Sequence, residues 1–373
     1  MKIVINAYSA RMGGGQTYLI NLLSHIPERK NFEVLVFAPP SLKLPVHPQI
    51  KRIYSSWPTT NPLLRALWER FLLPIFLRRE RADILFCPGG VIATPVPPGC
   101  KTVTMFRNMI PFDAPLVESM PWGFQRIRNL ILKRAMLQSM SRASLTIFIS
   151  DHARGVIEKL IRIPNPITIP HGISNVFRSF GSALQRPSKA PAEEYILYVS
   201  RFDVYKHHRE IIEAFAALDE KLTRDLRLVF LGEMDMPEIE PVRNLVKKLD
   251  LAKKVLMLGA VPYENLPAWY QHARLIIFAS SCENCPNILL ESMASGRPVV
   301  SSNVMPMPEF GGENLIYFSP FNPLDISMAL SKVLSDSVTE TKLAEAALLQ
   351  SLKYDWKQAS NKTWEKIMEL IEG

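Results

Sequence analysis

Short apolar segments alternate with amphipathic ones along most of the chain, and this alternation limits the folds that it can adopt. Residues 3–5, 102–106, 146–149 and 195–199 have the composition of buried strands, and helical patterns follow in the sequence. Strands that alternate with helices form parallel sheets covered by helices. We therefore predict an α/β protein, and 373 residues with 47% hydrophobic content suffice for two domains with full cores.

A polar stretch that contains Gly, Ser, Pro and Lys gives the clearest boundary between two such domains, at residues 180–194. We predict a first Rossmann-like domain over residues 1–180, a linker over 181–194 and a second Rossmann-like domain over 195–355.

Two acidic residues, Glu283 and Glu291, lie on either side of a predicted helix start. With Pro286 in the first turn and Gly296 as the C-cap, Glu283 falls in the loop and Glu291 about two turns inside the helix. A helix N-terminus suits a phosphate, and carboxylates accept hydrogen bonds from hydroxyls. The pattern therefore favours a sugar nucleotide, although two solvated acids beside an ordinary helix have the same spacing.

A second motif places two cations, Arg201 and Lys206, between the strand 195–199 and a predicted helix over 209–218. In open α/β sheets, ligands bind beyond the carboxyl ends of the strands. The two cations are thus well placed for a diphosphate, and the alternative is a solvated basic turn.

Together these residues resemble the retaining GT-B glycosyltransferases of the large family that includes sucrose synthase and bacterial cell-envelope sugar transferases. That family carries this Arg and Lys together with an E-x7-E motif. The resemblance covers nearly the whole chain and is closest in the second half. It extends to residues 294–300, Pro308-Glu309 and Leu231-Gly232-Glu233, and more loosely to the glycine loop at Gly13 and to His171-Gly172.

The resemblance implies a GT-B fold, with two Rossmann-like domains that face each other across a cleft. The first domain would bind the acceptor and the second the nucleotide sugar, and residues 356–373 would form a helix that packs back towards the first domain. It implies a donor site that needs no metal or other cofactor. The implied catalytic residues are Glu283, Arg201 and Lys206, and the implied donor-binding residues are these three with Gly232, Asn287, Ile288, Leu289 and Glu291.

The roles follow the same resemblance. Arg201, Lys206 and the helix N-terminus would meet the diphosphate. Glu283 would hold hydroxyls of the donor sugar, and Glu291 the ribose. The anomeric configuration would be retained. Because no carboxylate nucleophile is recognisable in the first domain, we favour departure of the nucleotide on the face that the acceptor attacks, with a phosphate oxygen assisting deprotonation of the acceptor.

The first domain carries a glycine loop that would let backbone approach a phosphate or the acceptor closely. A dinucleotide fingerprint is excluded because the third glycine is replaced by Tyr18. Many family members have His-Asp where this chain has Arg107 and Asn108, and an arginine cannot accept a proton at neutral pH. The residues expected at the acceptor or phosphate loop are Gly13, Gly14, Gly15, Arg107, Asn108 and His171.

Charge is divided unevenly, since residues 1–180 hold 23 Lys and Arg against 9 Asp and Glu. Segments 62–81 and 122–140 mix aromatic and aliphatic residues with basic ones, which suits an anionic membrane surface, although such stripes often face a core. The basic residues expected at the membrane are Arg65, Arg70, Arg126, Arg128, Lys133 and Arg134.

Neither a membrane-spanning run nor a signal peptide is visible, so we expect a cytoplasmic protein, peripheral on the membrane, with reduced cysteines. Cys282 and Cys285 form a C-x-x-C, but nearby ligands for zinc are missing, and packing around Glu283 is the favoured role.

The sequence thus predicts a transferase that moves a hexose from a nucleotide diphosphate sugar to a lipid-linked or polysaccharide acceptor in cell-envelope glycan synthesis, such as that of lipopolysaccharide. Alternatives are a GT-B transferase with a soluble acceptor and an inactive homologue that binds glycans or serves in assembly. Nucleic acid is not an expected partner, because no recognition motif accompanies the basic charge.

Overall fold

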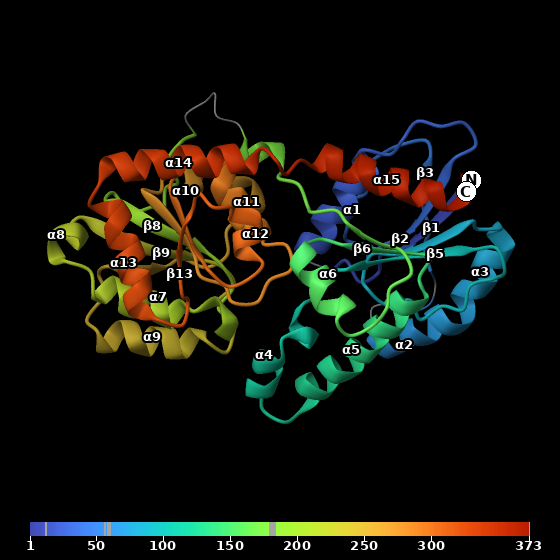
Figure 1. Ribbon diagram of the computed structural model, residues 1–373, viewed down its shortest axis with the longest axis horizontal. Helices are drawn as coiled ribbons and strands as arrows, with labels where there is room; N and C mark the ends of the chain where they lie inside the picture. The colour runs from blue at the N-terminus through green and yellow to red at the C-terminus, as the bar shows by residue number, and fades with distance from the viewer. Residues whose placement is uncertain (12, 56, 58–60, 179–183, 373) are drawn as a thin grey trace. The chain divides into compact units, whose positions relative to one another are not determined.

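The computed structural model describes residues 1–11, 13–55, 57, 61–178 and 184–372. The chain forms two compact units, one of Met1–Gly172 with Trp356–Gly373 and the other of Ile173–Asp355. Each unit is built on a parallel sheet covered by helices, which confirms the predicted α/β class and the two Rossmann-like domains (Figure 1). Residues 181–183 of the predicted linker lie outside the described residues.

The first unit contains a seven-stranded sheet in the order β3-β2-β1-β4-β5-β6-β7, with every neighbouring pair parallel. The strand order reverses at β1 and β4, which lie side by side although β2 and β3 intervene in the sequence. Strands β1 and β4–β6 are almost wholly buried, because helices cover both faces of the sheet. The strands are β1 (Lys2–Asn6), β2 (Glu33–Phe37), β3 (Ile50–Arg52), β4 (Ile84–Cys87), β5 (Lys101–Phe106), β6 (Leu145–Phe148) and β7 (Pro166–Thr168).

Helices α1 and α15 lie on one face of this sheet, and α2, α3 and α5 lie on the other (Figure 1). The C-terminal helix packs on α1, where the Trp364 indole Nε1 donates to the carbonyl oxygen of Leu22 over 2.9 Å. This packing agrees with the predicted return of the C-terminal helix to the first domain. The helices are α1 (Gly14–Ser24), α2 (Pro62–Leu67), the π-helical turn η1 (Trp68–Leu72), α3 (Leu73–Glu80), the 3₁₀ turn η2 (Ile110–Phe112), α4 (Ala114–Ser119), α5 (Phe124–Arg142), α6 (Asp151–Glu158) and α15 (Trp356–Glu372).

The second unit contains a six-stranded parallel sheet in the order β10-β9-β8-β11-β12-β13. Its strand order reverses at β8 and β11, so the loops that follow these two strands leave the same edge of the sheet side by side. The strands are β8 (Glu194–Val199), β9 (Leu226–Leu231), β10 (Val255–Met257), β11 (Leu275–Phe278), β12 (Val299–Ser302) and β13 (Ile316–Phe318).

Helices α7, α9 and α13 cover one face of the second sheet, and α11 and α14 cover the other (Figure 1). The helix predicted over 209–218 begins at His208, because His207 takes a left-handed conformation (φ 56°) that ends the preceding turn. The helices are the 3₁₀ turns η3 (Asn175–Phe177), η4 (Val204–Lys206) and η5 (Tyr263–Asn265), and α7 (His208–Ala216), α8 (Glu220–Thr223), α9 (Ile239–Lys248), α10 (Leu266–His272), α11 (Asn287–Ala294), α12 (Met307–Gly311), α13 (Pro323–Leu334) and α14 (Ser337–Ser351).

Candidate active site

The loop after β8 is held tightly against the end of β9. The Ser200 amide donates to the carbonyl oxygen of Leu231 over 2.8 Å, and a Cβ on Gly232 would lie 1.8 Å from the carbonyl oxygen of Ser200. Only glycine fits there. Gly232, predicted as a donor-site residue, is therefore placed to fix the backbone that carries Arg201.

Arg201 lies at the carboxyl edge of the second sheet with about half of its side chain exposed. Its Nε is 3.3 Å from Glu233 Oε2 and 3.8 Å from Asp203 Oδ2. Because the guanidinium is only loosely paired and reaches solvent, it is available to an anion such as a phosphate.

Lys206 and Glu283 form the most buried ion pair of this edge. Lys206 Nζ donates to Glu283 Oε1, and the side chains are 9% and 18% exposed. The ammonium also lies 5.2 Å from the ring centre of Tyr205 and 5.7 Å from that of Phe278. The structure thus brings together two predicted site residues that are 77 positions apart in the sequence.

Hydrogen bonds between the two loops maintain this pairing. The Ser281 amide donates to the carbonyl oxygen of Tyr205 over 2.9 Å, and the Ser281 hydroxyl is 2.8 Å from His207 Nε2. The loops follow β8 and β11, the adjacent strands at which the strand order reverses. Such a switch point is the usual ligand site of an open parallel sheet. Sequence reasoning missed Ser281 and His207, although both flank the motifs.

Glu291 is a buried acid rather than a solvated one, with 8% of the residue exposed on α11. The Tyr263 hydroxyl donates to Glu291 Oε1 over 2.8 Å. Burial raises the pKa of Glu291 to about 8, while the hydrogen bond from Tyr263 acts in the opposite direction. Sequence reasoning missed Tyr263, because it is far from the motif and meets Glu291 only in the fold.

The first turn of α11 differs slightly from its prediction. Pro286 is the N-cap residue rather than part of the first turn, and the helix begins at Asn287. The Asn287 amide donates to the carbonyl oxygen of Cys285 over 2.9 Å. The backbone amides of Ile288 and Leu289 follow in the first turn, where amides have no partner within the helix.

The predicted residues of the first unit also gather in one place. Gly13 has a left-handed φ of 59° and precedes Gly14, the first residue of α1. A Cβ on Gly15 would lie 3.3 Å from Arg107 Nη1, so the glycine loop and Arg107 are in close approach. Asn108 Oδ1 accepts from the Ile110 amide, the first of the 3₁₀ turn that follows, over 3.2 Å.

Tyr18 links Arg107 to His171. The Arg107 guanidinium lies 5.8 Å from the ring centre of Tyr18, whose other neighbours are His171, stacked at 5.6 Å, and Trp356 at 6.2 Å. Tyr18 and His171 are buried, and burial raises the pKa of Tyr18. Sequence reasoning used Tyr18 only to exclude a dinucleotide fingerprint and missed its contact with Arg107. Its position one turn after Gly15 was the available signal, because residues one turn apart face the same side of a helix.

The two basic and apolar segments of the first unit carry many large exposed side chains. Trp68, Leu73 and Leu77 face the core, as the alternative interpretation predicted for part of the stripe. Arg65 is also directed inwards, because it ion-pairs with Glu69 at 3.8 Å and donates to the carbonyl oxygen of Tyr8. The exposed apolar side chains of the two segments are Leu63, Leu67, Phe71, Leu72, Ile75, Trp122, Phe124, Ile127, Leu130 and Ile131.

Of the basic residues expected at a membrane, Arg70, Arg128 and Arg134 are exposed beside these apolar side chains. The Arg126 guanidinium lies 4.2 Å from the ring centre of Trp122. Lys133 Nζ lies 5.5 Å from that of Phe112. None of the helices in the described parts of the chain is both long and apolar enough to span a bilayer.

The cysteines of the C-x-x-C flank Glu283, with Cys282 buried and Cys285 half-buried, and all four cysteines of the chain are free thiols. Among the described residues, no three His, Cys, Asp or Glu side chains converge as metal ligands.

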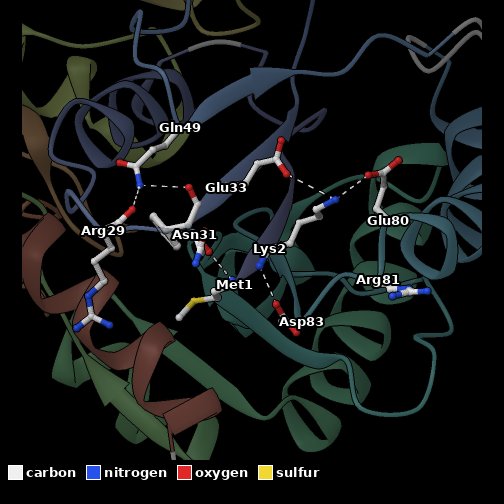
Figure 2. Close-up of a pocket in the computed structure, with 10 residues that line it drawn as sticks. Met1, Lys2, Arg29, Asn31, Glu33, Gln49, Glu80, Arg81 and Asp83 are labelled. Atoms are coloured by element: carbon white, nitrogen blue, oxygen red, sulfur yellow. Dashed lines mark hydrogen bonds and ion pairs between the residues drawn. The ribbon is translucent and has the colours of Figure 1, made fainter.

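A separate hollow of about 570 Å³ lies in the first unit, near the amino-terminal ends of β1 and β2 (Figure 2). Lys2 is already partnered there, since its Nζ lies 2.9 Å from Glu80 and 3.5 Å from Glu33, and its amide donates to Asp83. It is at the edge of the sheet opposite to the glycine loop, where parallel sheets rarely bind ligands.

Comparison with known proteins agrees with this architecture. Residues 182–350 match the family of glycosyl transferases group 1, and residues 12–175 match glycosyltransferase family 4. The chain is 26% identical over 269 residues to the O-antigen chain mannosyltransferase B of Escherichia coli, covering 70% of the chain and 69% of that protein. It is 25% identical over 182 residues to the serotype-specific mannosyltransferase WbdA of Escherichia coli, where the match covers 48% of the chain but only 22% of WbdA.

Solved structures share the whole fold at low sequence identity. Sucrose-phosphate synthase from Thermosynechococcus elongatus superposes with a TM-score of 0.76 at 15% identity, covering 100% of this chain and 99% of the other. WaaG, a glycosyltransferase involved in lipopolysaccharide biosynthesis, gives 0.72 at 17% identity, with 97% and 98% covered. The two family matches together take in most of both units, and the chain belongs to the glycosyltransferases of the GT-B fold.

Proposed function

We propose that the protein transfers a hexose, with retention of anomeric configuration, from a nucleotide diphosphate sugar to a lipid-linked or polysaccharide acceptor of the cell envelope. The observation that carries this proposal is the ion pair of Lys206 with Glu283 at the switch point of the second sheet, with Arg201 on the same loop as Lys206 and Glu291 buried on the helix that follows. Cations beside carboxylates match the two halves of such a donor, whose diphosphate is anionic and whose sugar and ribose carry hydroxyls.

Each residue has a distinct role in this proposal. Arg201 binds the diphosphate from the solvent side, and Lys206 reaches it from its position beside Glu283. The amides of Ile288 and Leu289 add a helix N-terminus. Glu283 accepts hydrogen bonds from the donor sugar, and Glu291 accepts them from the ribose. As the bond between the anomeric carbon and the phosphate oxygen breaks, these cations stabilise the charge on the departing nucleotide.

The acceptor oxygen forms its bond to the anomeric carbon on the same face, and its proton passes to a phosphate oxygen of the leaving nucleotide. This route needs no protein base, which is consistent with an arginine at position 107. In the first unit, the glycine loop with Arg107 and His171 is the proposed acceptor or phosphate loop.

The class of donor and acceptor is proposed from the related proteins. Two relatives are named mannosyltransferases, one of them of the O-antigen chain. A structure of similar fold, Anabaena Alr3699/HepE, was solved with UDP and glucose and superposes with a TM-score of 0.73 at 19% identity over 99% of both chains. These names favour a hexose donor and a surface glycan acceptor.

The exposed apolar and basic surface of the first unit favours a lipid-linked acceptor at the cytoplasmic face of an anionic membrane. Arginines attract lipid phosphates, while aromatic side chains enter the headgroup boundary. We expect Arg70, Arg128 and Arg134 replaced together by Gln to abolish sedimentation with anionic vesicles. The matched control replaces Lys247, Lys248 and Lys253, three exposed lysines of the second unit, and should sediment like the wild type. A wild type that ignores anionic vesicles would favour the soluble acceptor.

The donor assignment is tested by substituting the two cations. Incubation of the wild type with a panel of nucleotide sugars should reveal hydrolysis or transfer with one of them. Arg201→Ala and Lys206→Ala should each lower kcat/KM about ten- to hundredfold, because each removes a charge-assisted hydrogen bond. Arg243→Ala is the matched control, since Arg243 is equally exposed in the same unit and pairs with Glu240. Wild-type activity in the double variant would refute the donor site.

A further inference from the structure

We propose that Tyr263 is a positioning residue of the donor site, which holds the Glu291 carboxyl group in the orientation that receives the nucleotide. The inference rests on the donor-binding role proposed above for Glu291. Nothing in the sequence motif includes Tyr263, which lies 28 residues before Glu291 in the turn η5.

The first observation is the contact itself. The Tyr263 hydroxyl donates to Glu291 Oε1 over 2.8 Å, and this oxygen belongs to an acid of which only 8% is exposed. A buried carboxyl group without a donor would be costly and free to change rotamer. The bond therefore fixes the carboxyl plane and leaves the second oxygen, Oε2, for a nucleotide hydroxyl.

The second observation is that the Tyr263 side chain is both packed against a neighbouring ring and partly exposed to solvent. Its ring packs edge-on against Phe177 at 5.2 Å and 73°, yet 41% of the residue is exposed. Tyr263 is thus reached by solvent while it contacts the buried acid, and it lies in the segment that follows β10, beyond the carboxyl end of that strand.

The surroundings of Glu291 make this donor important. Burial is the main influence on the carboxyl and raises its pKa, and the Tyr263 hydroxyl is the group that opposes it. A second titratable group, Tyr270 on α10, also interacts with Glu291. Burial raises the pKa of the Tyr270 hydroxyl, and the negative charge of Glu291 raises it further. Loss of the Tyr263 hydroxyl should leave the Glu291 carboxyl group without this hydrogen bond and free to turn away from the nucleotide.

The test compares nucleoside diphosphate binding by isothermal titration in the wild type, Tyr263→Phe, Glu291→Gln and the double variant. Phenylalanine keeps the ring against Phe177 and removes only the hydroxyl. We expect Tyr263→Phe to raise the Kd, and the KM for the donor, about tenfold while kcat is unchanged. The double variant should bind no more weakly than Glu291→Gln, because Tyr263 acts through Glu291.

The matched control is Tyr195→Phe. The Tyr195 hydroxyl also makes a buried hydrogen bond, of 2.8 Å to the carbonyl oxygen of Trp269, but it lies near the amino-terminal end of β8. This variant should bind the nucleotide as the wild type does, and thermal melting should show that every variant is folded.

The outcomes separate the two proposals. If Glu291→Gln binds the nucleotide as tightly as the wild type, the donor assignment fails and this inference fails with it. If Glu291→Gln weakens binding but Tyr263→Phe does not, or if the two losses add in the double variant, only the positioning role of Tyr263 is overturned.

Discussion

Replacing Glu291 by Gln should stabilise the free protein at neutral pH, which is unusual for a residue of a binding site. The carboxyl is buried on α11, and the hydrogen bond from Tyr263 does not offset the burial. Glutamine has nearly the same shape and still accepts a hydrogen bond from Tyr263, but it never carries a charge.

The magnitude follows from the pKa, which burial raises from an ordinary 4.5 to about 8. Below 4.5 both the folded and the unfolded chain hold the proton, so the carboxyl has no effect on stability. Between these two values the unfolded chain releases the proton and the folded chain keeps it, and the free energy of unfolding falls by about 1.4 kcal/mol per pH unit. Over the whole window the loss is on the order of 3–5 kcal/mol, and above pH 8 it stays constant.

Urea unfolding between about pH 5 and pH 9 tests this, with hydrogen exchange of α11 peptides reporting on the second unit. The advantage of Glu291→Gln over the wild type should be small near pH 5, grow towards pH 8 and then level off. Glu313→Gln, an exposed acid of the same unit, should show no such trend. A difference between Glu291→Gln and the wild type that is the same at every pH would refute the reasoning.

Other substitutions test the packing that positions the site. Gly232→Ala should weaken nucleoside diphosphate binding at least about tenfold and cost roughly 2–4 kcal/mol of stability, because its Cβ would lie 1.8 Å from the carbonyl oxygen of Ser200. Gly155→Ala, on α6 with open space around it, should instead add about 0.5–1 kcal/mol in urea unfolding. Lys206→Met should lower the free energy of unfolding by roughly 2–4 kcal/mol, because it leaves Glu283 without its partner. Adding Glu283→Gln should restore part of that loss. Equal stabilities of the single and double variants would contradict the pairing.

The sequence by itself determined the features that depend on neighbouring residues. Apolar runs at 195–199 and 3–5 predicted strands, and a strand followed by a turn with Arg201 and Lys206 predicted a cationic loop at a carboxyl edge. Such patterns are local, because the spacing of apolar residues within a short segment indicates whether it forms a strand or a helix. The α/β class, and the placement of Glu283 before α11 and of Glu291 inside it, followed from the same kind of information. Glu291 nevertheless lies about one turn inside α11 rather than two, because the helix begins at Asn287.

Only the tertiary structure decided which distant residues meet. The strand order makes β8 and β11 neighbours, and Lys206 therefore contacts Glu283. A contact between residues 77 positions apart cannot be predicted from the periodicity of the sequence. The burial of Glu291 behind Tyr263 likewise depends on a turn that is remote in sequence. Exposure is decided in the same way, since Arg65 turns inwards and donates to the carbonyl oxygen of Tyr8, 57 positions away, while Arg70, in the same basic stripe, remains exposed. A stripe of apolar and basic residues specifies a helix face, but what covers that face depends on the packing of the whole unit.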